Sequence, residues 1–266
     1  KKISSAFSYA TDVVEVELPS TVTEISDYAF YHAISLEKID MSGTQITHLP
    51  DCCFSENARL SEILFPSALR TVGMMAFAGS PSLKSVTLPN ALSEIGHSMF
   101  FECIGLESIV IPDSVKKIGD YALSRATSLK SIVIPDSVEI IGEYAFAESG
   151  FIEFTIPDAE IGDYALFSCE SLKRVTVLGS GRTPLGLCMA CTSLTDVVLD
   201  GKFTEISDDS FAACSSLTEL TLPRTVRVIG NAAFEGCSAL KTLKIKGKIT
   251  EIGNSAFYGA SSLESF

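Results

Sequence analysis

Apolar residues recur along this chain at a nearly fixed interval. The leading apolar position of each unit follows the previous one by 21 to 24 residues. These positions are Val13, Leu36, Leu60, Leu83, Leu106, Leu129, Phe151, Leu172, Leu194, Leu217, Leu240 and Leu263. The octapeptide Ser-Ile-Val-Ile-Pro-Asp-Ser-Val occurs twice, from Ser108 and again from Ser131, 23 residues apart. A period of this size is typical of a solenoid, in which each unit buries its apolar face against its neighbours.

Each leading position opens a short stretch of alternating apolar and polar residues. Val86 and Leu88 alternate with Ser85 and Thr87, which is the period-2 pattern of a half-buried strand. Proline follows this stretch at Pro19, Pro66, Pro89, Pro112, Pro135, Pro157 and Pro223. Because proline has no backbone N–H, we predict that it ends each strand. The repetition predicts that the strands of successive units pair in parallel.

The rest of each unit is predicted to return the chain to the next strand. It holds two apolar anchors, such as Val115 and Ile118, and then a glycine column in most units. Pro50 and Pro184 occupy this column elsewhere, so it does not need the left-handed backbone that glycine permits. An acid or amide comes next, followed by Ala-Phe. We interpret this as a one-turn helix whose first amides bind the acidic group.

These patterns predict an α/β, β-rich fold. It is a right-handed solenoid of about 11 units of 23 residues, with a parallel sheet on one face and short helical turns on the return. No gap between units is long enough for a linker, so we predict one domain over residues 1–266. The chain starts and ends within a unit, and we expect it to be a fragment of a longer protein.

The unit resembles the BspA-like leucine-rich repeat family, close to the Treponema pallidum type. The resemblance rests on Leu-x-x-Val-x-Leu-Pro followed by Ile-Gly-x-x-Ala-Phe-x-x-Cys, nearly complete from Leu217 to Cys237, and it covers essentially the whole chain. It implies a leucine-rich repeat solenoid in a secreted or surface-anchored protein of anaerobic bacteria or mucosal protists. It also implies binding to host extracellular-matrix proteins or to other microbes.

Charge and hydropathy narrow the range of partners. The formal net charge is −13, whereas a protein that tracks a phosphate backbone needs a basic face, so we expect no nucleic-acid partner. No apolar run approaches the roughly 20 residues of a membrane-spanning helix, so we expect no membrane insertion.

Five of the eight cysteines occupy one column of the repeat. Cys103, Cys169, Cys191, Cys214 and Cys237 lie three residues after the phenylalanine position, where other units have mostly Ala or Ser. We interpret them as small buried side chains. A disulfide between neighbours such as Cys214 and Cys237 remains open. Cys188 and Cys191 have redox or zinc spacing, but both occupy core columns and no second pair accompanies them, so we predict no metal site.

Other chemical signals are weak. Gly179 to Thr183 superficially resembles a phosphate loop, but it lacks the Gly-Lys-Ser/Thr ending, so we predict a simple turn. His97 follows the glycine column and is predicted to be solvated. No catalytic triad, paired carboxylates or cofactor fingerprint recurs, so we expect neither an enzyme nor a cofactor.

The outward strand positions are the candidate protein-binding residues. They change from acidic in the first units to neutral in the middle, where Val110 and Val133 are predicted to be exposed side by side. The candidates are Ser85, Thr87, Ser108, Val110, Ser131, Val133, Glu153 and Thr155. A simpler interpretation is that Ser, Thr and Val suit a strand.

We therefore predict a non-catalytic module of a secreted or cell-surface protein. It would adhere to host matrix, cell-surface or microbial surface proteins through the exposed strand face. One alternative is an inert spacer that holds another domain away from the cell wall. Another is an intracellular scaffold, which the many unpaired cysteines favour.

Overall fold

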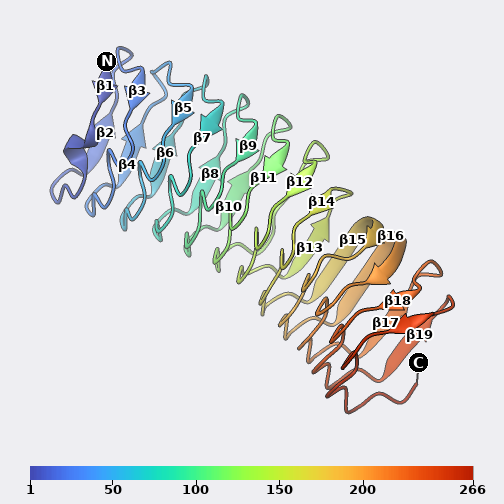
Figure 1. Cartoon of the computed structure of the whole chain (residues 1–266). Helices are drawn as coiled ribbons and strands as arrows, with labels where there is room; N and C mark the ends of the chain where they lie inside the picture. The colour runs from blue at the N-terminus through green and yellow to red at the C-terminus, as the bar shows by residue number, and fades with distance from the viewer. Residues whose placement is uncertain (266) are drawn as a thin grey trace. The chain divides into compact units, whose positions relative to one another are not determined.

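The computed structural model describes residues 1–265 and divides into two compact units. Unit 1 covers Lys1–Ala145 and unit 2 begins at Phe146. Each unit is a stack of coils, and most coils carry a front strand after the leading apolar residue and a shorter back strand on the return (Figure 1). The solenoid of parallel strands is thus confirmed, whereas a single domain over residues 1–266 stays a prediction.

Unit 1 has short strands on both sides of its coils. The front strands are β2 (Glu15–Glu17), β4 (Lys38–Asp40), β6 (Glu62–Leu64), β8 (Ser85–Thr87) and β10 (Ser108–Val110). The back strands are β1 (Lys2–Ile3), β3 (Glu24–Ile25), β5 (His48–Leu49), β7 (Thr71–Val72), β9 (Glu94–Ile95), β11 (Lys117–Ile118) and β12 (Ile140–Ile141). All paired strands of this unit are parallel.

Unit 2 contains longer strands. Its front strands are β13 (Glu153–Ile156), β15 (Arg174–Arg182), β16 (Asp196–Ile206), β17 (Glu219–Leu222) and β19 (Thr242–Ile245). Its back strands are β14 (Glu160–Ile161), β18 (Val228–Ile229) and β20 (Glu251–Ile252). β16 pairs with β15 at the front and reaches β18 at the back, so it spans both sides of its coil.

Proline follows most of the front strands that end early, although β4 and β19 end without one. β8 and β10 end just before a Leu-Pro or Ile-Pro pair, whereas β15 and β16 have no proline there and continue for 9 and 11 residues in all. The prediction of a turn at Gly179 to Thr183 is therefore wrong, because most of this segment extends β15 alongside residues 201–205. A missing proline leaves the N–H groups free to continue the ladder.

The return consists of turns. Within residues 1–265 the one helix is the 3-10 helix η1 (Ser5–Phe7), so the predicted one-turn helices do not form. Two residues per coil typically adopt the left-handed region, as Tyr28 (φ 57°) and His32 (φ 54°) do. The N–H groups of Tyr28, Phe30 and His32 donate to carbonyls of the next coil at 3.2, 2.8 and 2.9 Å. Alternate amides thus point along the stack, which a helix would prevent.

The glycine column lets neighbouring coils approach closely. A Cβ on Gly119 would lie 2.9 Å from both the carbonyl carbon of Gly96 and the nitrogen of His97. Gly119 has no positive φ, so the prediction that this column does not need a left-handed backbone is confirmed there. The acid that follows also bonds to the next coil: the Glu143 N–H donates to Asp120 Oδ1 at 3.0 Å.

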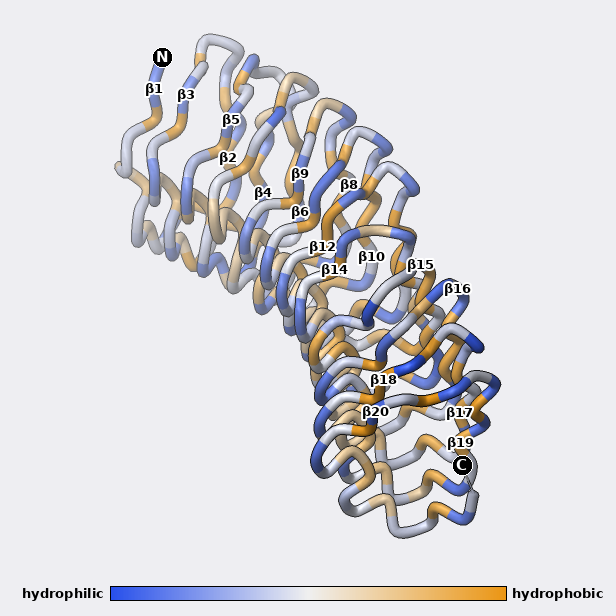
Figure 2. Tube along the Cα trace, turned by 45° about the vertical axis from the view of Figure 1, so that its right-hand side comes forward, coloured by the Kyte–Doolittle hydropathy of each residue, from blue (hydrophilic) through white to orange (hydrophobic). Residues whose placement is uncertain are grey.

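The core of each unit is built around stacked phenylalanine rings. In unit 1, Phe54 lies 5.0 Å from Phe30 and 5.4 Å from Phe77, measured between ring centroids. In unit 2, Phe234 stacks on Phe211 at 5.7 Å. These rings are buried, and Figure 2 shows hydrophobic stretches recurring in successive coils. The Ala-Phe pairs therefore face inward.

The front sheet of unit 1 is interrupted. β2, β4 and β6 form one ladder, and β8 and β10 form another. Residues 131–134 form no strand, so the front strand predicted in that coil is wrong. Within the described residues of this unit, the ladder bonds therefore stop between β6 and β8 and again after β10.

Candidate protein-binding face

All eight candidate residues are exposed. Ser85 and Thr87 lie on β8, and Ser108 and Val110 lie beside them on β10, with Ser85 opposite Ser108 and Thr87 opposite Val110. We call these four residues the β8–β10 patch. Their inward neighbours, Val86 and Ile109, are 4% and 8% exposed, so the alternation that defines the face is confirmed.

Val133 differs in structure from Val110, which occupies the same position in the first copy of the octapeptide. Val110 is 57% exposed and Val133 is 83% exposed, but residues 131–134 form no strand beside β10. The predicted side-by-side pair of Val110 and Val133 on one sheet is therefore not formed. Ile132 and Ile134 are also only partly buried, whereas Ile109 and Ile111 are each 8% exposed. Ser131 and Val133 lie on an extended, unpaired segment.

Glu153 and Thr155 belong to unit 2 and lie on β13. They are opposite Arg174 and Thr176 of β15. Arg174 in turn contacts Asp196, with a nitrogen-to-oxygen distance of 2.6 Å. This part of the front face therefore carries cross-strand charge pairs, in contrast to the β8–β10 patch, whose four side chains are uncharged.

Acidic side chains dominate the first three front strands. Lys38 lies between Glu15 and Glu62 in the register and contacts Glu62 at 2.9 Å. The hydrogen bond to Glu62 raises the pKa of Lys38. Asp40 accepts hydrogen bonds from the hydroxyl and the N–H of Ser42, which lower its pKa. The predicted change from acidic to neutral is thus present along unit 1.

All eight cysteines are buried and free. In the small-residue column the thiols donate to carbonyl oxygens of an earlier coil, as Cys103 does to Phe77 at 3.3 Å and Cys237 does to Phe211 at 3.1 Å. Burial raises the pKa of each of these two thiols to about 12. The interpretation of this column as core packing is confirmed, and none of its neighbouring pairs is bonded.

The redox or zinc interpretation of Cys188 and Cys191 finds no support in the geometry. Both thiols are fully buried, and within residues 1–265 no cluster of three or more His, Cys, Asp or Glu could hold a metal ion. His97 is exposed and lies 3.8 Å from Asp120, measured from Nδ1 to the carboxylate oxygen. In the described part of the chain, no helix is long and apolar enough to cross a membrane.

Sequence reasoning missed a cluster of aromatic rings on the return of unit 1. Tyr9 lies 5.5 Å from Tyr31 and 5.3 Å from His32, and Tyr28 lies 5.6 Å from Tyr31, measured between ring centroids. Tyr9 and Tyr28 are 64% and 49% exposed. The available signal was the segment Tyr28-Ala-Phe-Tyr-His32, in which the rings flank the buried Phe30.

Two solved bacterial structures show the same fold. A leucine-rich repeat protein from Bacteroides ovatus is 28% identical, with a TM-score of 0.71 over 98% of this chain and 81% of that one. A leucine rich cell surface protein from Faecalibacterium prausnitzii is 26% identical, with a TM-score of 0.61 over 100% of this chain and 82% of that one. No curated protein matches the chain.

The family comparison covers nearly the whole sequence. The model described as BspA type Leucine rich repeat region (6 copies) matches residues 2–106, 93–183 and 185–266. These matches include all the front strands and the cysteine column. The chain therefore belongs to the BspA-type leucine-rich repeat family.

Proposed function

We propose that this chain is a non-catalytic protein-binding module of a secreted or cell-surface protein. It binds through its exposed front strands and serves in adhesion to host matrix proteins or to surface proteins of other microbes. Leucine-rich repeat domains are generally protein-binding modules without catalytic activity. The cell-surface description of the Faecalibacterium relative supports this location for the chain as well.

The observation that carries the proposal is the exposed valine of the β8–β10 patch. Val110 presents 57% of its surface to solvent among the hydroxyl groups of Ser85, Thr87 and Ser108. An apolar side chain within an uncharged polar surround matches the composition of a protein interface core, from which charged residues are depleted. Nearby Ser131 and Val133, and on unit 2 Glu153 and Thr155, extend the set of exposed candidates.

A binding screen tests the proposal. The purified chain is first screened against immobilised extracellular-matrix glycoproteins and bacterial surface proteins. The double variant Val110→Glu and Val133→Glu is then compared with the original chain, because both side chains are exposed and tolerate charge. A central interface contact contributes about 2 kcal/mol or more, so we expect at least a roughly tenfold loss of affinity.

The matched control carries the same two charges outside the front strands. Met74 and Ile104 are 45% and 48% exposed on the return segments, so Met74→Glu and Ile104→Glu should leave affinity unchanged. If the folded double variant Val110→Glu and Val133→Glu binds as tightly as the original chain, this face is not the binding site. The absence of any protein ligand in the screen would favour the inert spacer.

A further inference from the structure

The ladder between β6 and β8 lacks hydrogen bonds that its neighbours make. At the same point of the repeat, the N–H groups of Leu18, Met41 and Leu88 donate to the next strand at 2.8, 2.8 and 3.1 Å. The equivalent donor is Phe65 and the equivalent acceptor is the Thr87 carbonyl, but these two are not bonded in the described structure.

A backbone hydrogen bond is also missing at the N-terminal end of β6 and β8. The Glu62 N–H donates to the Glu37 carbonyl at 3.1 Å, and the Ser108 N–H donates to the Lys84 carbonyl at 3.2 Å. No bond within residues 1–265 joins the corresponding Ser85 N–H to Ser61. Two main chains therefore face each other with backbone donors and acceptors that the protein itself leaves unpaired.

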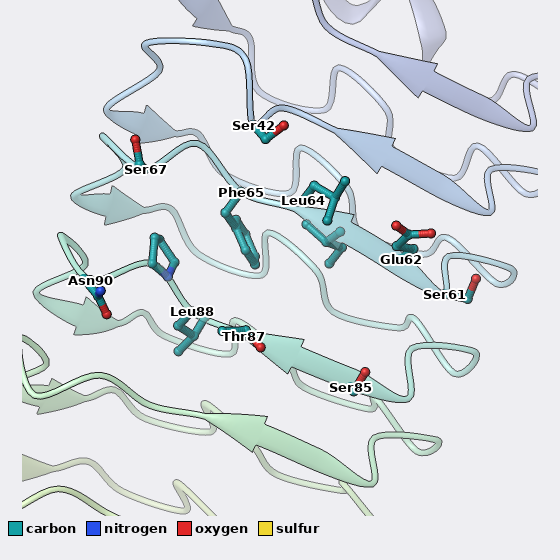
Figure 3. A pocket seen from close by; sticks show the side chains of 12 residues that line it. Ser42, Ser61, Glu62, Leu64, Phe65, Ser67, Ser85, Thr87, Leu88 and Asn90 are labelled. Carbon is teal, nitrogen blue, oxygen red and sulfur yellow. The ribbon is translucent and has the colours of Figure 1, made fainter.

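A groove of about 570 Å³ lies at this gap. Leu64 and Phe65 line one side and Leu88 lines the other, as Figure 3 shows, and Pro89 is also among the lining residues. Ile63 and Phe65 are partly exposed, whereas Val86 and Leu88, in the same two columns of the next coil, are only 4% and 2% exposed. The groove is therefore a place where core-type side chains can be reached from outside. Its volume is in the range of binding pockets.

The ring of Phe65 accounts for the opening. Leu18, Met41 and Leu88 occupy the same column in nearby coils, so Phe65 is the bulkiest of these side chains. It packs edge-on against Phe77, with ring centroids 5.6 Å apart and planes at 87°. The position of Phe77 is in turn fixed by the stack of phenylalanine rings, which leaves the larger side chain to be accommodated at the strand edge.

One carboxylate lines the groove, and others lie on the two front strands before it. Glu62 lines it, and the front strands beside it carry Glu15, Glu17 and Asp40 against the single cation Lys38. Lys38 already contacts Glu62 at 2.9 Å, so three other carboxylates remain without a cation on these outward positions. A cationic ligand is favoured here by the local field.

We propose that this groove binds an extended segment of a partner protein. The segment inserts one large apolar or aromatic side chain between β6 and β8 and carries a Lys or Arg that faces the acidic side chains of β4 and β6. This inference rests on the proposed protein-binding function and gives it a specific site. An extended peptide fits because its own N–H and C=O groups repeat along the strand direction and complement those of Phe65, Ser85 and Thr87.

Two other occupants fit less well. Both walls of the groove belong to one molecule, so a second copy could enter only with a projecting loop and not with its sheet edge. A sugar could bond to the hydroxyl groups of Ser85 and Thr87, but it would not match the backbone spacing along two strands. Both occupants are outcomes of the test below.

The test begins with a phage-displayed library of linear dodecapeptides selected on the immobilised chain. We expect enrichment of a large apolar residue near a Lys or Arg. An enriched peptide, synthesised with a fluorescent label, should bind at least tenfold more weakly to Glu62→Lys and to Phe65→Leu. The control Glu251→Lys changes an exposed acid on a back strand and should not alter binding.

Amide hydrogen exchange then locates the peptide. If the inference holds, bound peptide slows exchange of the Phe65 and Ser85 amides at least tenfold. If the peptide slows amide exchange only in β10, the strand of Val110, the groove is not its binding site, but the proposed protein-binding function still stands. Failure to enrich any peptide, binding of glycans alone, or a dimer that Glu62→Lys dissociates would also overturn the inference about the groove. If the double variant Val110→Glu and Val133→Glu loses matrix binding but still binds the peptide, the matrix-binding face and the groove are two different sites.

Discussion

At the scale of single residues, glycine has a packing role in this repeat. Gly119 has ordinary backbone angles, and its missing Cβ leaves room for the main chain of the preceding coil. The residues that do adopt the left-handed region include Tyr28, Cys52 and Tyr121, which are not glycine. The turns thus impose strained backbone on ordinary residues, while the glycine at the position of Gly119 serves close approach between coils.

Gly119→Ala should destabilise unit 1 by about 1 to 3 kcal/mol, because the new methyl group overlaps backbone atoms 2.9 Å away. Gly43→Ala is the control, since nothing lies within 4 Å of a Cβ at that position. We expect Gly43→Ala to be neutral or slightly stabilising. Urea denaturation of the two variants measures the difference. Equal midpoints would contradict the close-approach explanation.

At the scale of elements, the two identical octapeptides adopt different structures. Residues 108–110 form β10 and pair with β8, whereas residues 131–133 form no strand. Their local propensities are the same, so the difference comes from the neighbouring coils. The consequence is visible in the core, where Ile109 is 8% exposed and Ile132 is only partly buried.

Ile109→Ala and Ile132→Ala form a matched pair, because the same change is made in the same eight-residue sequence. We expect Ile109→Ala to cost about 2 to 5 kcal/mol, as a buried truncation does, and Ile132→Ala to cost less. Thermal unfolding followed by circular dichroism gives both values. A larger loss for Ile132→Ala would mean that residues 131–134 are packed more tightly than this structure has them.

The same pair of segments marks the limit of prediction from sequence. Periodicity and proline predicted the solenoid, the position of most front strands and the exposure of Ser85, Thr87, Ser108 and Val110, because these depend on alternation within one coil. The unpaired segment at Val133 depends on contacts between coils. Such contacts leave no mark on a repeated octapeptide.

The groove at Phe65 was missed for a related reason. Phe65 reads as one more apolar residue in its column, and its size matters only because its ring meets that of Phe77 on the return of the same coil. The helical turns were mispredicted because an acid after glycine resembles an N-cap. In the structure the Asp120 carboxylate binds the amide of Glu143 in the next coil instead.

At the scale of the whole molecule, all eight thiols are buried and therefore shielded from reagents in the solvent. They are buried and free, and the column that holds five of them also accepts alanine, as at Ala33 and Ala126. A thiol that is buried and has a raised pKa is a poor nucleophile at neutral pH. The cysteines therefore give no preference for an oxidising or a reducing compartment, and the proposed surface location rests on other grounds.

The folded chain should expose no reactive thiol at pH 8, and the denatured chain should expose eight. The pKa of Cys103 in the fold is about 12 and lies above that of an unfolded thiol near 8.5. Its contribution to stability is therefore complete below about pH 8.5 and is lost as the pH rises towards 12.

The variant Cys103→Ala checks this dependence. Between about pH 9 and 11 its free energy of unfolding should fall less steeply than that of the original chain, by about 1.4 kcal/mol per pH unit. Denaturant titrations at several pH values measure the slopes. Identical slopes would show that the thiol ionises in the folded state as readily as in the unfolded one.

The bonds between coils also bear on how such a gene can change. Glu143 bonds to Asp120, Asn231 bonds to Asp208 and Asn254 bonds to Asn231, each pair 23 residues apart. Deleting or duplicating one such interval in frame joins equivalent residues and restores the same partners. Unequal recombination can therefore lengthen or shorten the array without inventing a new contact. The twin octapeptides have the form that a duplication of this kind would leave.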